Sequence, residues 1–173
     1  MSTGLPELLD AWRTVNARRV YEGRLPLAAM SRLGEYLADA EGECGFRIEF
    51  GRDEFGVAFI DLKAEAALPL ICQRTLERFA QPVAIEQRLG LIRDERDEAS
   101  LPPGYEPVLL PEDARLNPAE LIEDELILAV PVVPVRPGTE AVEAHWAETQ
   151  EEVEDERPNP FAALSALKQT KKL

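Results

Sequence analysis

The middle of the chain has apolar side chains on a two-residue period. Apolar and polar residues alternate over residues 44–50, and two further alternating stretches follow at residues 57–70 and 83–91. This period is that of a half-buried β-strand, and three strands joined by short connections without helices favour an antiparallel meander. The apolar positions change from odd to even numbers after Phe59, so the pattern also predicts a β-bulge near Phe59–Ile60.

The segments on either side of these strands have the spacing of short amphipathic helices. We expect helices over residues 5–15 and 27–40, with a strand at Val20–Tyr21 between them. The clearest helix start lies at residue 117, where Asn117 can cap and Pro118 suits the first helical position. That helix should end before Pro131, and residues 105–110 favour a short additional strand. The sequence therefore predicts one α+β domain over residues 1–135, an antiparallel β-meander sheet of about four or five strands with flanking helices.

The acidic residues are concentrated in the C-terminal half. The net charge is −14, and residues 94–156 alone contribute −16, whereas residues 1–93 contribute −2 and residues 157–173 contribute +4. Residues 136–157 have little to bury and are predicted to be an acidic linker or tether. Residues 158–173 should form a short C-terminal amphipathic helix with a basic tip, because Asn159 and Pro160 repeat the helix-start signal. An acidic tether ending in such a helix favours a basic protein partner.

Candidate partner-binding residues come from two of these segments. Three carboxylates share one face of the predicted helix at 117–129, where a solvated face is the simpler interpretation and a contact surface for a basic partner is the alternative. In the C-terminal segment, an isolated tryptophan and an apolar stripe could dock onto a partner. The partner-binding candidates are Glu120, Glu123, Asp124, Trp146, Phe161, Leu164 and Leu167.

Arginines surround the first predicted strand and the last strand of the meander. If these strands lie near each other, the arginines form a basic patch that could contact an RNA backbone. The other interpretation is ordinary surface arginine balanced by neighbouring acids, and no aromatic RNA-stacking motif accompanies the pattern. The RNA-contact candidates are Arg18, Arg19, Arg74, Arg78 and Arg88.

The residues that could carry catalysis are few. The single histidine, His145, lies in the predicted linker, and the chain has no phosphate-cradling loop or nucleotide fingerprint. Together with Cys44 and Cys72 it gives too few ligands for a tetrahedral metal site, so we expect both cysteines to be buried apolar side chains at strand ends. We therefore expect no catalytic residue, no metal and no cofactor. No apolar run approaches the roughly 20 residues of a membrane span and no secretory signal is visible, so the cytoplasm is the expected location.

Five blocks of the sequence form a pattern: RRVYEGRL (18–25), LICQRTLERF (70–79), LPPGYEPV (101–108), LIEDELILAVPVVPV (121–135) and RPNPFAALSALK (157–168). In their residues, order and spacing these blocks resemble the YceD family, the bacterial and plastid proteins required for accumulation of large-subunit (23S) ribosomal RNA. One departure is that family members commonly carry Cys-x-x-Cys where this chain has Cys72-Gln73-Arg74-Thr75. Thr75 replaces the second cysteine, so any metal or redox role of that turn is expected to be dispensable here.

The resemblance implies a non-enzymatic factor in large ribosomal subunit assembly. Genes of the family often neighbour one for a small basic large-subunit ribosomal protein, which fits the charge distribution. Together they predict that the chain binds a basic large-subunit ribosomal protein or a pre-ribosomal particle, and no membrane. The alternative is direct contact with 23S rRNA through the five arginines given above.

Overall fold

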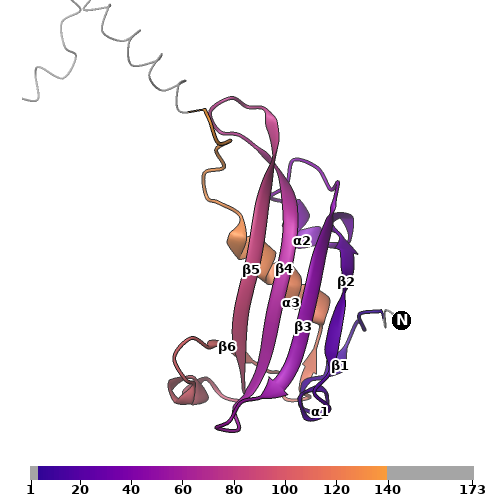
Figure 1. Cartoon of the computed structure of the whole chain (residues 1–173), viewed down its shortest axis with the longest axis vertical. Helices are drawn as coiled ribbons and strands as arrows, with labels where there is room; N and C mark the ends of the chain where they lie inside the picture. Colours follow the sequence, from indigo (N-terminus) through magenta and orange to yellow (C-terminus); the bar gives the residue numbers. More distant parts are fainter. Residues whose placement is uncertain (1–3, 140–173) are drawn as a thin grey trace, which may run out of the picture. The chain divides into compact units, whose positions relative to one another are not determined.

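A five-stranded β-sheet is the main element of the computed structural model, which describes residues 4–139 (Figure 1). Residues 4–136 belong to one compact unit. The sheet has the strand order β2-β3-β4-β5-β6, and a separate two-stranded pairing joins β1 to β7. The strands are β1 (Leu9–Asp10), β2 (Val20–Pro26), β3 (Glu43–Arg52), β4 (Ala58–Ile71), β5 (Arg78–Ile92), β6 (Glu106–Leu109) and β7 (Arg115–Leu116). The predicted α+β class is confirmed.

The predicted meander is present, and its strands are longer than expected. Strands β2 to β5 pair antiparallel in chain order. The prediction of a wholly antiparallel sheet is wrong at one edge, because β6 pairs parallel with the end of β5. The chain between them is too long for a hairpin: it contains the 3₁₀-helix η2 (Glu95–Ser100) and returns to start β6 beside Leu89.

The predicted bulge near Phe59–Ile60 is wrong. Ile60 pairs with Phe50 and Phe59 with Gly51, and the register continues without interruption along β4 on both of its sides. Val57 lies in the turn before β4, so the strand begins at Ala58 and its even positions face the core from the start. Phe59 faces the other side of the sheet, and a Cβ added to Gly51 would lie 2.7 Å from its ring, which explains why glycine stands opposite this phenylalanine.

Two of the three predicted helices are shorter than expected. The first is α1 (Ala11–Asn16), because Leu9 and Asp10 pair with β7 and the Asp10 side chain caps the helix. In place of a helix over 27–40 the chain forms a 3₁₀ turn, η1 (Leu27–Ala29), and a single helical turn, α2 (Ser31–Gly34). The third helix, α3 (Pro118–Ala129), is confirmed, and the Asn117 side chain accepts hydrogen bonds from the N–H groups of Ala119 and Glu120.

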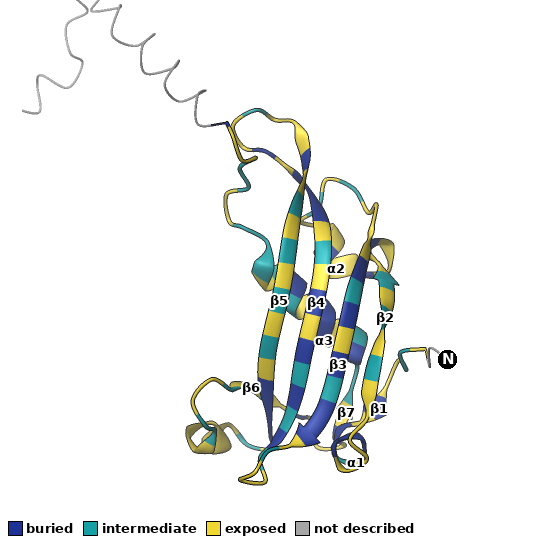
Figure 2. Ribbon diagram, viewed as in Figure 1, coloured by how far each residue is buried: buried dark blue, intermediate teal, exposed yellow. Residues whose placement is uncertain are grey.

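The hydrophobic core lies between α3 and one face of the sheet. Ile122 and Leu126 of α3 are fully buried, as are the alternate residues Ile48, Ile60 and Leu62 of β3 and β4. Figure 2 shows the resulting bands of buried and exposed residues along the central strands. Within residues 4–139, no helix covers the opposite face of the sheet (Figure 1), where Lys63 and Glu86 are exposed.

Candidate functional site

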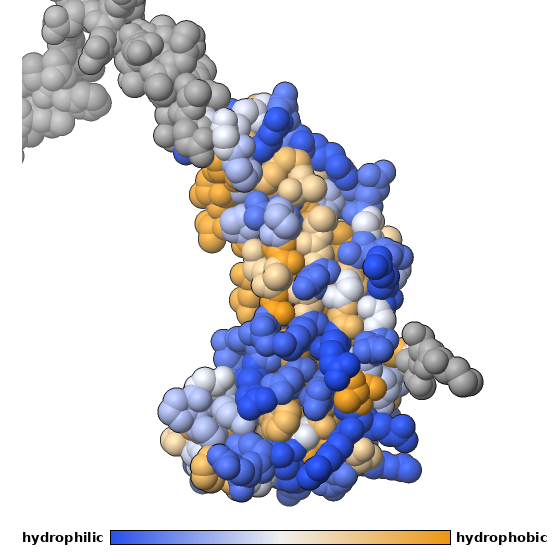
Figure 3. All heavy atoms as spheres, viewed as in Figure 1, coloured by the Kyte–Doolittle hydropathy of each residue, from blue (hydrophilic) through white to orange (hydrophobic). Residues whose placement is uncertain are grey.

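The open face of the sheet carries rows of opposite charges. Glu22, Arg47, Lys63 and Glu86 occupy facing positions on β2, β3, β4 and β5. Arg47 binds Glu22 at 3.0 Å, and Lys63 binds Glu86. Figure 3 shows hydrophilic side chains gathered over the lower half of this face. Because exposed ion pairs contribute only about 0–1 kcal/mol each, these rows balance the charge of the face more than they stabilise it.

Arg88, an RNA-contact candidate, is the most enclosed arginine of this face. Its guanidinium binds Asp61 at 2.6 Å and lies 4.6 Å from the centroid of the Phe59 ring and 5.7 Å from that of Tyr105. The hydrogen bond with Asp61 raises the pKa of Arg88 above its usual value. Its charge is therefore directed at a neighbouring strand.

The five candidate arginines do not form one patch. Arg18 and Arg19 precede β2 at the end of the sheet where β3 finishes, and both are exposed. Arg74 and Arg78 lie at the opposite end, in and after the β4–β5 turn, and Arg78 binds Asp39 and Glu41. Arg78 and Arg88 are ten residues apart on β5, which corresponds to about 33 Å. The condition for one patch, that the first strand and the last meander strand lie near each other, is not met, because β3 and β4 separate β2 from β5. Arg74 and Arg78 also lie at the opposite end of β5 from Arg88.

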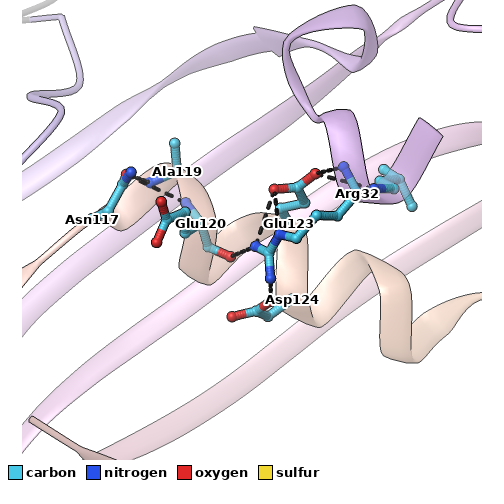
Figure 4. Close-up of polar contacts among 7 residues, drawn as sticks. Arg32, Asn117, Ala119, Glu120, Glu123 and Asp124 are labelled. Atoms are coloured by element: carbon cyan, nitrogen blue, oxygen red, sulfur yellow. Dashed lines mark hydrogen bonds and ion pairs between the residues drawn. The ribbon is translucent and has the colours of Figure 1, made fainter. Parts of the chain in front are cut away.

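Glu123 is the acidic candidate that the structure places differently from the sequence expectation. It is only 6% exposed, and its Oε1 accepts hydrogen bonds from the backbone N–H groups of Arg32 at 2.7 Å and Leu33 at 3.0 Å (Figure 4). The Arg32 guanidinium binds its other oxygen at 3.0 Å. The interpretation of a solvated helix face is therefore wrong for this residue, which caps the first turn of α2 from 91 residues away.

The other two carboxylates of α3 are more accessible. Asp124 binds the same Arg32 guanidinium at 2.5 Å, and the Glu120 backbone carbonyl accepts a further bond from it (Figure 4). The Glu120 side chain is exposed and has no ion pair among the described residues. Sequence reasoning did not identify Arg32, and no local pattern could have done so, because its partners lie on a helix far along the chain.

Two of the blocks that carry the family resemblance meet at the β4–β5 turn. The segment after α3 runs beside this turn: Gln73 donates its N–H to the Pro134 carbonyl at 2.8 Å, and Arg136 binds Glu77 at 3.0 Å. The Arg136 N–H also donates to Sγ of Cys72 at 3.4 Å, which together with the Thr75 hydroxyl lowers the pKa of that thiol to about 6. Thr75, at the position of the missing cysteine, is thus a polar neighbour of Cys72.

Both cysteines are buried, as expected. Cys44, at the beginning of β3, has its pKa raised to about 11 by burial. Cys44 and Cys72 are free thiols. In the part of the chain that the structure describes, no cluster of His, Cys, Asp or Glu is arranged to hold a metal ion.

Exposed apolar residues accompany the same turn. Leu76 has a left-handed backbone (φ 58°) and is 75% exposed, and Val132 and Val133 in the adjacent segment are 99% and 61% exposed. The left-handed region is unfavourable for a bulky side chain, and exposed apolar residues of this kind often mark contact surfaces.

The remaining partner-binding candidates, Trp146, Phe161, Leu164 and Leu167, lie outside the described residues. His145 lies outside them as well. Among residues 4–139, no helix has the length and apolar character required to cross a membrane.

Comparison with known proteins identifies the family. The model of the YceD family, described as Large ribosomal RNA subunit accumulation protein YceD, matches residues 60–168. This range includes β4, β5, α3 and the turn described above. The chain therefore belongs to the YceD family.

A curated relative extends the similarity to nearly the whole chain. The Large ribosomal RNA subunit accumulation protein YceD of Haemophilus influenzae is 28% identical over 169 residues, which cover 95% of this chain and 97% of the relative. No solved structure matches the chain. The similarity thus covers the sheet, its helices and the acidic C-terminal half together.

Proposed function

We propose that the chain is a non-enzymatic factor of the cytoplasm that is needed for 23S rRNA accumulation and for assembly of the large ribosomal subunit. The observation that carries this proposal is membership of the YceD family over residues 60–168, supported by a full-length relative named for large ribosomal RNA subunit accumulation. It acts by binding a basic large-subunit ribosomal protein or a pre-ribosomal particle.

The unpaired carboxylates of the described C-terminal half support a basic partner. Glu95 and Glu98 of η2, together with Glu106 and Glu120, are exposed and form no ion pair within residues 4–139. Glu125 is partly buried, and burial followed by the charges of Glu106 and Asp124 raises its pKa. A cationic side chain placed beside these groups would relieve the repulsion among them, which favours association with a basic protein.

The apolar residues of the C-terminal segment belong to the same proposal. Trp146, Phe161, Leu164 and Leu167 would anchor the partner, and the acidic residues before them would attract it over a longer range. Replacing Phe161 and Leu164 with Asp is expected to reduce partner recovery and to leave the melting of the described unit unchanged. A loss of several kcal/mol in unfolding free energy would instead identify them as core residues.

The proposal is tested by recovering partners from a lysate with the tagged full-length chain. The wild type should retain a basic large-subunit ribosomal protein or pre-ribosomal particles at low salt and lose them as the salt concentration rises. The variant Glu95→Gln, Glu98→Gln, Glu120→Gln should retain at least several-fold less. Its matched control is Glu22→Gln, Glu43→Gln, Glu86→Gln, which removes the same charge from acids that already have arginine or lysine partners. Recovery of neither ribosomal protein nor 23S rRNA by the wild type would contradict the proposal.

Direct contact with 23S rRNA is the second candidate function. It is favoured by Arg18 and Arg19, which are exposed and have no acidic partner among the described residues. Arg78 and Arg88 support it less, since each already binds a carboxylate.

A further inference from the structure

Apart from Arg74 in the β4–β5 turn, the arginines of the described chain fall into two groups according to their partners. Most bind a carboxylate, and those pairs are Arg24–Glu43, Arg32–Glu123, Arg47–Glu22, Arg78–Asp39, Arg88–Asp61, Arg96–Asp94, Arg115–Asp113 and Arg136–Glu77. A second group is exposed and forms no ion pair within residues 4–139. It consists of Arg13, Arg18, Arg19, Arg52 and Arg93.

The second group lies around one end of the sheet. Arg13 is in α1, and Arg18 and Arg19 form the link from α1 to β2. The Arg19 carbonyl accepts a hydrogen bond from the N–H of Phe50 at 2.9 Å, which places this link beside the end of β3, where Arg52 lies. Arg93 follows β5. We call these five residues the arginine end.

The Trp12 side chain of α1 lies beside arginines from two other parts of the chain, Arg52 of β3 and Arg93 after β5. The Arg93 guanidinium lies 4.7 Å from the centroid of the Trp12 ring on α1. Trp12, Arg52 and Arg93 line one open hollow of about 290 Å³, together with Ser100 and the acid Asp97. A neighbouring hollow is lined by Trp12, Arg93 and Glu112. Neither acid forms an ion pair with Arg52 or Arg93 in the described structure, so both guanidinium groups can accept a further anionic partner.

Clustered guanidinium groups that form no ion pair with a carboxylate favour an anionic ligand that binds at several points. Arginine matches phosphate geometry with two parallel donors and stacks on aromatic rings. Phosphates repeat along a nucleic-acid backbone, so they can meet arginines that come from α1, β3 and the end of β5. Trp12 lines the hollow with the Arg93 guanidinium over its ring, and aromatic rings and arginine planes are the surfaces on which bases stack.

We propose that the arginine end binds RNA through its backbone phosphates, with the hollow beside Trp12 receiving one nucleotide. The identity of that RNA as a large-subunit rRNA rests on the proposed function. Two of the RNA-contact candidates predicted from the sequence, Arg18 and Arg19, belong to this site. Its other members are Arg13, Arg52 and Arg93, and the candidates Arg74, Arg78 and Arg88 lie outside it. Asp97 and Ser100 of η2 line the hollow beside Trp12, so the RNA site adjoins Glu95 and Glu98 of the acidic surface proposed for the basic partner.

Binding of a labelled single-stranded RNA by the full-length chain tests the site. The probe has about 20 nucleotides, longer than the roughly 4–16 that a small single-strand site covers. The variant Arg13→Gln, Arg19→Gln, Arg52→Gln is compared with Arg24→Gln, Arg96→Gln, Arg115→Gln, which removes the same charge from exposed arginines that have carboxylate partners.

The first variant should bind the RNA at least about tenfold more weakly than the wild type, and the control within about twofold. Because each phosphate contact contributes about 0.7 to the salt slope for single strands, loss of three contacts should reduce the slope of log K against log salt by about 2. If the first variant melts early, Arg18→Gln with Arg19→Gln provides a smaller change in the exposed link, with a slope reduction of about 1.4.

Several outcomes would overturn the site. The first is that the wild type binds no RNA, and the second is that both triple variants lose the same amount of binding. The third is that polyglutamate displaces the RNA as readily as unlabelled RNA does, which would indicate an acidic protein as the ligand. The proposed function is tested separately by recovering ribosomal proteins after ribonuclease treatment. A wild type that retains the ribosomal protein but binds no RNA refutes only the site, and one that binds RNA but retains no ribosomal protein refutes only the protein partner.

Discussion

The open sheet face and the arginine end use the same residue type in opposite ways, and two residues of β3 show the contrast. Arg47 faces Glu22 across the sheet and binds both Glu22 and Glu49. Arg52, five positions further along the same strand, donates within residues 4–139 only to the Gly56 carbonyl, at 2.9 Å. On the open face the strand register places opposite charges side by side, whereas Arg52 faces Ala58, which has no carboxylate. The availability of an arginine therefore depends on register and not on the charge count of the chain.

The largest effect is expected at Glu123, the buried member of a charged pair. Replacing Glu123 with Ala should reduce the unfolding free energy by roughly 3 kcal/mol, because two backbone N–H groups at the start of α2 and the Arg32 guanidinium lose their acceptor. Urea unfolding measures the change. Glu120→Ala, on the exposed side of the same helix, is the control and should change stability by less than about 0.5 kcal/mol. Equal values for the two variants would show that the Glu123 contacts do not hold α2 in place.

A smaller effect is expected on the open face. Arg88→Gln and Asp61→Asn should each reduce stability by about 1 kcal/mol, and a double-mutant cycle should give a coupling of similar size. The coupling should fall when salt is raised, since both groups are partly exposed. Zero coupling at low salt would mean that Arg88 is held by the Phe59 and Tyr105 rings instead of by Asp61.

The arginine end should contribute still less to stability. The variant Arg13→Gln, Arg19→Gln, Arg52→Gln is expected to unfold within about 0.5 kcal/mol of the wild type, because these side chains form no ion pair in the described structure. Chemical denaturation of the purified chain provides the value. A loss above about 1 kcal/mol would identify a structural role and would reverse the contrast with the open face.

The smallest effect concerns like charges. Burial and the neighbouring charges of Glu106 and Asp124 raise the pKa of Glu125 in the folded chain. The Glu125 carboxyl group therefore stabilises the folded chain at pH values below its unfolded pKa, and this stabilisation is lost as pH rises through the folded pKa. Glu125→Gln should therefore be slightly more stable than the wild type at pH 7, by less than about 0.5 kcal/mol. The difference should shrink as pH falls, which thermal melts at a series of pH values would reveal. A variant that is less stable at pH 7 would contradict the direction of this shift.

The fold was predictable where local patterns decide the structure. The two-residue period predicted β3, β4 and β5, and the Asn117–Pro118 pair predicted the start of α3 with the hydrogen bonds that cap it. The amphipathic helix predicted over residues 27–40 is wrong, because Leu27 and Leu33 reach the core from a 3₁₀ turn and a single helical turn. The parity change at Phe59 came from including Val57, a turn residue, in the strand.

The candidate site was less predictable because its contacts are long-range. Arg32 and Glu123 are 91 residues apart, and the parallel pairing of β6 depends on how a loop returns. Sequence proximity grouped the arginines around each strand, whereas the sheet register determines which of them meet a carboxylate. Arg52 is not among the RNA-contact candidates predicted from the sequence, where it stands beside the acids Asp53 and Glu54. Within residues 4–139 neither acid forms an ion pair with it.

The order of elements along the chain has a consequence for synthesis. Strands β2 to β5 pair with their immediate neighbours in sequence, so the meander can form as a nascent chain emerges. Part of its apolar side stays uncovered until α3 is translated, because Ile122 and Leu126 of α3 belong to the same core as Ile48, Ile60 and Leu62. A chain whose translation stops before α3 would expose apolar surface of the sheet and would be prone to aggregation. Glu123 lies on the same helix, so its carboxylate can cap the first turn of α2 only after this late segment has been translated.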